Sequence, residues 1–292
     1  MNSVPLRKGE QVMARNTKHI RPRAHTVCSR MISLDLSGKV ALIAGVQNEY
    51  SLGWAAGKKL LEAGATCVFS FQGERNLPAL EKLTAAYKSQ IAFLDVCDVS
   101  KDEDLEKLFA RIKSDCGRLD FVMHAIAFTP RSSQENPFLQ TTRSDWQIAL
   151  DVSAYSLVAL AQHAAPLMES GSSIVALSYY AAEKVVAKYN VMGIAKSALE
   201  SSARYLAYDL GPKGIRVNIV SPGPMRTVAA KSIPGFTSMY EKAAKTAAMG
   251  RNATFEEVGN TCLYLFSGLS SGTTGETIYV DAGYSIMGMA LD

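Results

Sequence analysis

The chain has 292 residues, of which 48% are apolar and 20% charged, a composition typical of a soluble protein with an ample core. No uninterrupted apolar run approaches the ~18–20 residues of a membrane-spanning helix, so a membrane partner is not expected. The net charge of +4 comes from residues 1–30, which hold seven Lys or Arg against one acid (+6). The remaining 262 residues therefore carry −2, which excludes a nucleic-acid binder by charge.

Residues 1–30 form a basic segment without helical or strand periodicity, and we predict a disordered N-terminal extension. Met31 could open the functional chain, which we favour, or the segment could be an organelle transit peptide, since it is basic and poor in acids. Five cysteines without a CxxC pair predict reduced thiols and a cytoplasmic location: Cys28, Cys67, Cys97, Cys116 and Cys262. The four histidines form no ligand cluster, so no metal is predicted.

From residue 39 onward, strand and helix patterns alternate. In chain order we predict strand 40–44, helix 54–62, strand 66–71, helix 78–87, strand 91–94, helix 101–116, strand 119–127, helix 144–168, strand 173–177, helix 189–210, strand 215–220 and strand 277–280. Strict alternation with short connections predicts an α/β fold with a Rossmann-like, doubly wound parallel sheet of seven strands. We expect residues 31–292 to form this single domain.

A glycine-containing turn, residues 45–53, follows the first strand. Such a turn lets the backbone approach a pyrophosphate, and the next helix offers free N–H groups. The turn is longer than GxGxxG, and Ser51 stands where a middle glycine could, so a plain strand-to-helix loop is the alternative. After the second strand, Gln72 can bind ribose hydroxyls without charge, Glu74 would repel a 2′-phosphate and Arg75 would attract one. This favours NADH over NADPH.

Tyr189 and Lys196 lie seven residues apart at the start of a predicted helix. Seven residues are nearly two turns, so both side chains share one face. The phenol can donate a hydrogen bond to developing oxyanion charge, while the ammonium can hold sugar hydroxyls and lower the phenol's pKa. The alternative is a half-buried tyrosine beside a solvated lysine.

With this glycine turn and this Tyr–Lys pair, the chain resembles the short-chain dehydrogenase/reductase superfamily. Within it, the chain is similar to the enoyl-acyl-carrier-protein reductases of bacterial type II fatty-acid synthesis. The resemblance covers Leu34 to Met289. It is carried by the stretches 177–179, 189–196, 214–218 and 222–227. The superfamily usually places Tyr and Lys four residues apart. The wider gap here, with Tyr179 ten residues upstream of Tyr189, is similar to the enoyl reductase branch.

The resemblance implies a role for each matched residue. Tyr189 would bind the thioester carbonyl and stabilise the enolate, Lys196 would hold the nicotinamide ribose, and Tyr179 would line the acyl pocket. Thr129 falls at the family's substrate contact. The cofactor would lie against Gly45, Ser51, Leu52, Gln72, Asp98, Val99, Ile126, Met225, Arg226, Thr227, Val228 and Ala229. Asp98 could instead only cap the helix that follows it.

The implied reaction is NADH-dependent reduction of trans-2-enoyl thioesters, carried on acyl carrier protein, to saturated acyl thioesters in fatty-acid elongation. A 3-oxoacyl reductase and a non-catalytic NAD(H)-binding regulator stay open as alternatives. The Tyr–Lys spacing argues against the first, and the intact pair argues against the second.

Three further expectations follow from the resemblance and the sequence. Ala127 stands where this branch often has glycine, which would narrow the pocket beside the nicotinamide. Residues 228–249 would form a lid over the acyl chain. The helix at 190–210 is apolar over a broader arc than one sheet face covers, which predicts a homo-oligomer, with a tetramer favoured.

Overall fold

The structure is a computed structural model that describes residues 34–227, 230 and 235–289. The described residues belong to one compact unit, Leu34–Asp292. The predicted N-terminal extension, its boundary at residues 30 and 31, and the cofactor positions Val228 and Ala229 lie outside the described residues.

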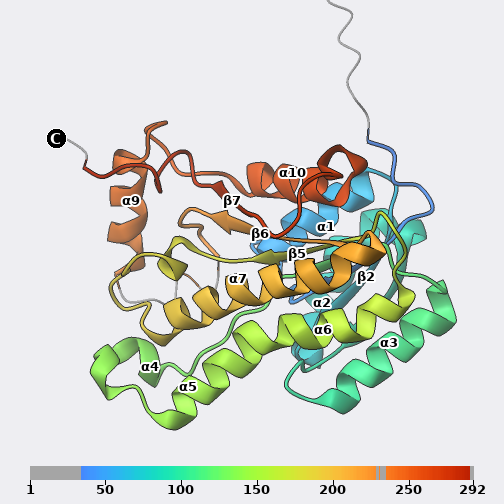
Figure 1. Ribbon diagram of the computed structural model, residues 1–292, viewed down its shortest axis with the longest axis horizontal. Helices are drawn as coiled ribbons and strands as arrows, with labels where there is room; N and C mark the ends of the chain where they lie inside the picture. Colours follow the sequence, from blue (N-terminus) through green and yellow to red (C-terminus); the bar gives the residue numbers. More distant parts are fainter. Residues whose placement is uncertain (1–33, 228–229, 231–234, 290–292) are drawn as a thin grey trace, which may run out of the picture. The chain divides into compact units, whose positions relative to one another are not determined.

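The centre of this unit is a sheet of seven parallel strands in the order β3-β2-β1-β4-β5-β6-β7 (Figure 1). The strands are β1 (Val40–Ala44), β2 (Thr66–Phe71), β3 (Ile91–Val96), β4 (Phe121–His124), β5 (Ser173–Leu177), β6 (Arg216–Pro222) and β7 (Thr277–Val280). The predicted doubly wound α/β fold is confirmed. Strand order reverses between β1 and β4, and such a switch point opens a ligand crevice at the carboxyl ends of the strands.

Helices cover both faces of the sheet. They are α1 (Leu52–Glu62), α2 (Leu77–Thr84), α3 (Asp102–Cys116), α4 (Ser132–Glu135), α5 (Arg143–Leu150), α6 (Ser156–Ala164), α7 (Val191–Leu210), α9 (Phe236–Thr246) and α10 (Phe255–Phe266). α1 and α10 lie on one side, and α3, α6 and α7 on the other (Figure 1). The sequence prediction lacks α10, although Thr254 and Glu257 form a reciprocal capping box that marks its start.

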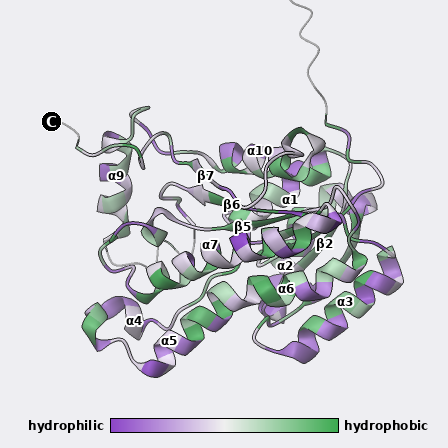
Figure 2. Cartoon of the chain, viewed as in Figure 1, coloured by the Kyte–Doolittle hydropathy of each residue, from purple (hydrophilic) through white to green (hydrophobic). Residues whose placement is uncertain are grey.

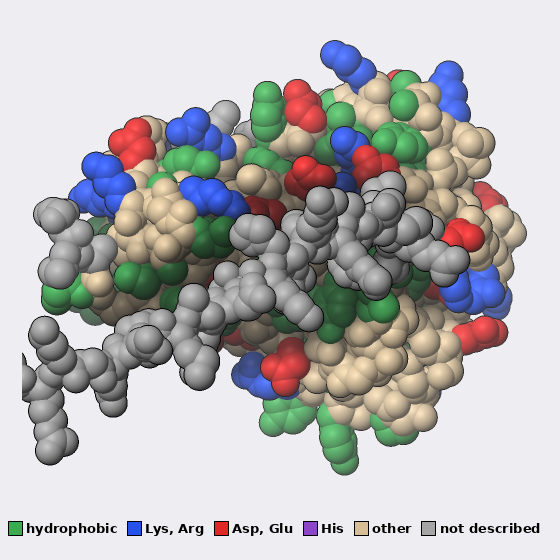
Figure 3. Space-filling model, turned by 90° about the horizontal axis from the view of Figure 1, so that it is seen from above, with side chains coloured by type: hydrophobic (Ala, Val, Ile, Leu, Met, Phe, Trp, Pro, Cys, Tyr) green, Lys and Arg blue, Asp and Glu red, His purple; other side chains and the backbone are tan. Residues whose placement is uncertain are grey.

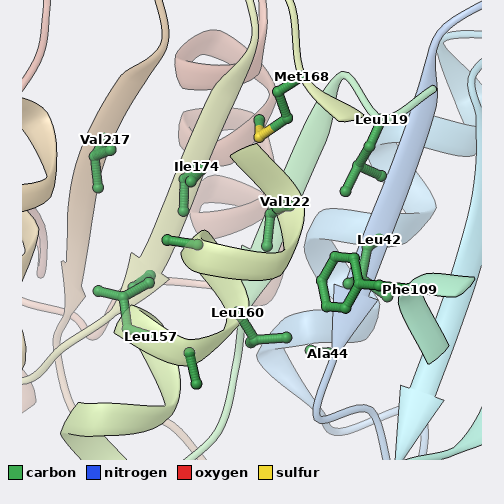
Figure 4. Close-up of a cluster of buried hydrophobic side chains, with 14 of the residues drawn as sticks. Leu42, Ala44, Phe109, Leu119, Val122, Leu157, Leu160, Met168, Ile174 and Val217 are labelled. Atoms are coloured by element: carbon green, nitrogen blue, oxygen red, sulfur yellow. The ribbon is translucent and has the colours of Figure 1, made fainter. Parts of the chain in front are cut away.

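Two apolar clusters hold the helices on the sheet. In one of them, Val122 of β4 and Ile174 of β5 meet Leu157 and Leu160 of α6 (Figure 4). Helix α3 shows how the sequence directs this packing, since its apolar residues are buried and its polar ones face outward (Figure 2). Basic and acidic side chains are interspersed over the face seen in Figure 3, in keeping with the near-neutral charge of residues 31–292.

The predicted helix at 144–168 contains a π-helical turn, Asp151–Tyr155, between α5 and α6. The combined helix Arg143–Leu167 has the length and mean hydropathy of a membrane span, but half of its most apolar window is buried. Its packing on the sheet accounts for that apolar character. Strand β4 ends at His124 and not at Ala127, because the chain then turns toward Ser153 of the π-helical turn. The Ser153 hydroxyl donates to the carbonyl of Phe128 and accepts from its N–H, each at 2.9 Å.

Candidate active site

The predicted site residues meet along one edge of the sheet. All seven strands are parallel, so their carboxyl ends share that edge. The residues that follow these strand ends in turn are Gly45, Gln72, Asp98, Ile126, Tyr179 and Met225. Residues that are far apart in sequence therefore stand at one edge of the sheet, and their joint role in cofactor binding stays a prediction.

The turn after β1 fits a pyrophosphate group. Gly45 has φ 98°, and a Cβ there would lie 2.4 Å from the carbonyl oxygen of Ala125, so a larger residue would push β1 and β4 apart. The Ser51 hydroxyl oxygen accepts the N–H groups of Gln47 and Asn48, both at 3.1 Å. Its own hydrogen stays available to a ligand, next to the N-terminal N–H groups of α1, which starts at Leu52.

The residues after β2 and β3 are largely solvent-exposed or bonded locally. Gln72, Glu74 and Arg75 are exposed. The Asp98 carboxylate accepts the backbone N–H of Ser100 at 3.2 Å and its hydroxyl at 2.8 Å. These bonds close a local turn before α3, whose N-terminal capping residue is Lys101, so Asp98 does not cap the helix; Val99 lies within the same turn.

Lys196 is buried in the second turn of α7, with 4% of its surface exposed. Its Nζ donates to the carbonyl oxygen of Leu177, at the end of β5, at 2.7 Å. Burial lowers the pKa of Lys196 to about 8, because removal from water disfavours the ammonium, while nearby Glu200 opposes the shift. The alternative of a solvated lysine is therefore excluded.

Tyr189 precedes α7, which begins at Val191 after the non-helical Asn190, so the prediction that Tyr189 and Lys196 share one helix face is wrong. The Tyr189 ring packs on that of Tyr179 with centroids 5.0 Å apart and planes at 57°. Burial raises the pKa of Tyr189 well above its usual range, and Tyr179 adds to the effect. Burial raises the pKa of Tyr179 in the same way. The expectation that the ammonium lowers the pKa of Tyr189 is not met, because desolvation dominates. Both phenols keep their protons at neutral pH and can donate hydrogen bonds.

Two buried polar side chains near Lys196 were missed by the sequence analysis. His124 Nε2 lies 2.8 Å from Ser156 Oγ, and that hydroxyl donates to a carbonyl of the π-helical turn, so Nε2 carries the proton. Burial first, and the charge of Lys196 second, lower the pKa of His124 to about 3, which keeps the ring neutral. Glu200 accepts a hydrogen bond from the Ser178 hydroxyl, and burial raises its pKa. A histidine inside an apolar strand and a Lys–Glu pair four residues apart were the available signals.

Helix α9 lies against Tyr179. The Tyr179 hydroxyl is 3.9 Å from the sulfur of Met239, and the Arg226 guanidinium stacks over the Tyr240 ring at 4.4 Å. The Thr227 hydroxyl oxygen accepts the N–H of Ala230 at 3.0 Å, which leaves its hydrogen for a ligand. Of the predicted lid, residues 228–249, the structure describes α9, which contacts Tyr179 through Met239.

Residues 128–136 follow Ile126 and the exposed Ala127. We call them the substrate-side loop, because they contain Thr129, the expected substrate contact. Thr129 is buried, and its hydroxyl lies 2.5 Å from that of Ser133. Ser133 donates to the carbonyl of Pro130 at 2.7 Å, so the Thr129 hydroxyl must donate to Ser133. Thr129 can then only accept a hydrogen bond from a substrate. No cluster of metal-binding side chains occurs among the described residues.

A doubly wound parallel sheet, a glycine-containing turn after β1, and Tyr189 and Lys196 at the start of α7 are typical of Rossmann-type reductases. The family model described as Enoyl-(Acyl carrier protein) reductase matches residues 45–285. Enoyl-acyl-carrier-protein reductase (NADH) FabI of Bacillus cereus is 42% identical over 253 residues, covering 87% of this chain and 99% of the relative. The chain therefore belongs to the enoyl-acyl-carrier-protein reductase family, and the resemblance seen in the sequence is confirmed.

Solved structures agree with this assignment. The Bacillus cereus enzyme with NADP+ and indole naphthyridinone has a TM-score of 0.85 at 42% identity, covering 87% of this chain and 99% of that one. The enzyme from Anaplasma phagocytophilum in complex with NAD has a TM-score of 0.83 at 39% identity, covering 88% and 97%.

Proposed function

We propose that this protein reduces trans-2-enoyl thioesters, carried on acyl carrier protein, to saturated acyl thioesters with NADH, as a step of fatty-acid elongation. The observation that carries the proposal is the pair of protonated phenols, Tyr179 and Tyr189, whose rings pack together at 57° at the strand edge where Lys196 is buried. Membership of the enoyl reductase family supports the same reaction.

NADH supplies a hydride to the β-carbon of the enoyl group when it is bound in the crevice. Negative charge then collects on the thioester oxygen, and the Tyr189 hydroxyl donates a hydrogen bond to it. The α-carbon of the enolate then takes up a proton from solvent, directly or through a relay, which gives the saturated thioester and NAD+. Because burial raises the pKa of Tyr189, the donor stays protonated throughout. Lys196, one and a half turns into α7, holds ribose hydroxyls with its ammonium. Met239 of α9, packed over Tyr179, helps to exclude water from the reacting atoms.

The cofactor is NADH in this proposal, with NADPH used less well. Gln72 carries no charge, and the nearby Glu74 carboxylate would oppose a 2′-phosphate. The curated relatives are named as NADH enzymes, which agrees, while the Bacillus cereus structure holds NADP+.

The test is oxidation of NADH by the purified protein with crotonyl thioester, with acetoacetyl thioester and with neither. We expect turnover with the crotonyl substrate alone. Turnover only with the acetoacetyl substrate would instead assign a 3-oxoacyl reductase. Binding of NADH without turnover of either thioester would assign a non-catalytic regulator.

We also propose a homotetramer in which α7 packs against α7 of a second copy. The outer face of α7 leaves Tyr205 73% and Tyr208 80% exposed. A hollow of about 460 Å³ lies between α6 and α7, lined by Val158, Ala198, Ser201, Ser202, Tyr205, Leu206 and Asp209. The small side chains among these would let a second helix approach closely. Light scattering at micromolar concentration tests the proposal, and an active species of 31.5 kDa would contradict it.

We further propose a cytoplasmic location. Cys67, Cys97, Cys116 and Cys262 are free thiols, as expected in a reducing compartment, whereas Cys28 lies outside the described residues. Fractionation of source cells, probed with an antibody against the protein, is the direct test. Recovery in an organelle fraction would favour the transit-peptide interpretation of residues 1–30.

A further inference from the structure

The backbone on both sides of Tyr189 lies in a conformation that residues with a Cβ rarely adopt. Lys188 has φ 65°, and Asn190 has φ 47° with ψ −125°. Such residues persist only where the surrounding structure holds them, and they gather at functional sites. Tyr189, the hydrogen-bond donor of the proposed mechanism, thus lies between two residues with unfavourable backbone conformations. Other contacts must hold these two residues in place.

The Asn190 side chain makes such contacts. Its Nδ2 donates to the carbonyl oxygen of Ser133 at 2.9 Å and to that of Asn136 at 3.0 Å. Asn190 is also the N-terminal capping residue of α7, where an asparagine ordinarily accepts a helix N–H with its side chain. No such capping bond is formed here. The amide therefore connects two segments that are more than 50 residues apart in sequence.

The segment that Asn190 holds is the substrate-side loop, residues 128–136. Ser133 makes three hydrogen bonds in this loop. Its carbonyl oxygen accepts from the Asn190 amide, and its hydroxyl accepts from the Thr129 hydroxyl and donates to the Pro130 carbonyl. The other end of the loop is fixed at Phe128, where Ser153 bonds both backbone groups. A continuous chain of hydrogen bonds thus runs from the residue beside Tyr189 to Thr129, the expected substrate contact.

We propose that Asn190 is a positioning residue for the reduction. Its amide sets the separation between the Tyr189 hydroxyl and the substrate-side loop, so that a thioester bound against the loop presents its oxygen to the phenol. This proposal rests on the proposed role of Tyr189. It assigns Asn190 no contact with substrate or cofactor and predicts an effect on turnover and not on NADH binding.

The variants Asn190→Gly and Asn190→Asp distinguish the effect of the backbone conformation at residue 190 from the effect of the side-chain hydrogen bonds. Glycine adopts the positive φ readily but removes both hydrogen bonds. Aspartate tolerates positive φ nearly as well as asparagine, but its ionised carboxylate faces two carbonyl oxygens without a donor. We expect kcat with crotonyl thioester to fall about tenfold or more in both variants, since a displacement of ~1 Å can cost ~10²-fold. The Kd for NADH, measured by fluorescence titration, should stay within about twofold of the parent.

A pH series on the aspartate variant distinguishes positioning from a general loss of structure. When its carboxyl is protonated at low pH, it regains one donor, so its kcat relative to the parent should rise as pH falls. The glycine variant has nothing to protonate, and its relative kcat should stay flat. If the glycine variant does not fold, as judged by circular dichroism, the pH series alone decides.

Tyr189→Phe separates failure of this inference from failure of the proposed function. Parent-like kcat in Tyr189→Phe would overturn the role of Tyr189 itself. A low kcat in Tyr189→Phe together with parent-like kcat in Asn190→Gly, or a flat pH series in Asn190→Asp, would overturn the positioning role alone.

Discussion

The two halves of the crevice are built in different ways. At the ends of β2 and β3, Gln72 and Glu74 are exposed, and Asp98 bonds only to residues within six positions of it, Ser100 and Asp104. At the end of β5, Lys196 and Glu200 are 4% and 6% exposed and bond to residues 19 and 22 positions away. The first half offers only locally bonded backbone and solvated side chains to the cofactor that we propose for it. The second half uses burial to shift pKa values, as reaction centres commonly do.

The largest expected effect lies in the buried half. Tyr189→Phe removes the oxyanion donor but keeps the ring that packs on Tyr179, so kcat with enoyl thioester should fall about 10²–10³-fold while NADH binding stays near normal. Steady-state kinetics and fluorescence titration measure the two quantities. Tyr180→Phe, at a tyrosine packed on Tyr284, is the matched control and should keep kcat near that of the parent.

Lys196→Met should weaken NADH binding by about tenfold or more, because hydrogen bonds to a charged group contribute roughly 1.5–3 kcal/mol. In the parent, NADH affinity should also decline as pH rises through about 8, where Lys196 loses its proton, and the variant should lack this dependence. Titrations from pH 6.5 to pH 9.5 measure both effects. An unchanged Kd in the variant would remove Lys196 from the ribose site.

The same lysine has a consequence for stability. Its pKa is about 8 in the folded protein and 10.5 in the reference state, so between these values the unfolded chain binds more protons. The contribution of Lys196 to the free energy of unfolding therefore rises with pH across this window. Denaturation at pH 8 and pH 10 should show a steeper rise for the parent than for Lys196→Met.

A smaller effect is expected in the exposed half. Glu74→Gln removes a charge that opposes a 2′-phosphate, so kcat/KM with NADPH should rise several-fold while kcat/KM with NADH changes little. Glu81→Gln, on the exposed side of α2, is the matched control. If the parent already prefers NADPH, the charge argument is wrong and Arg75 becomes the candidate phosphate contact.

The smallest effect concerns the basic segment. Deletion of residues 2–30 should leave kcat and the thermal midpoint near those of the full chain, because 87% of this chain already covers 99% of the Bacillus cereus relative. Thermal unfolding and the crotonyl thioester assay measure this. A large drop in the midpoint on truncation would contradict the prediction of a separate extension.

Local patterns were enough for the fold and for the place of the site. Alternating strand and helix segments determined the parallel sheet, whose carboxyl edge then had to collect Gly45, Gln72 and Tyr179. The spacing of Tyr189 and Lys196 placed both residues at the start of α7, but the fixed pitch of a helix does not relate their side chains, because the chain enters the helix only at Val191. Helix α10 was missed although its capping box is local, so that omission was one of interpretation.

Tertiary structure alone decided the chemistry of the buried half. The sequence pattern predicted a lower pKa for Tyr189, yet burial raises it. Three features depend on partners 25 to 57 residues away in sequence. They are the turn of the chain from β4 toward Ser153, the neutral His124, and the hydrogen bonds of the Asn190 amide to the substrate-side loop. A residue's spacing in the chain determines its helix face or strand edge. Its desolvation and its long-range hydrogen-bond partners exist only once the elements have packed.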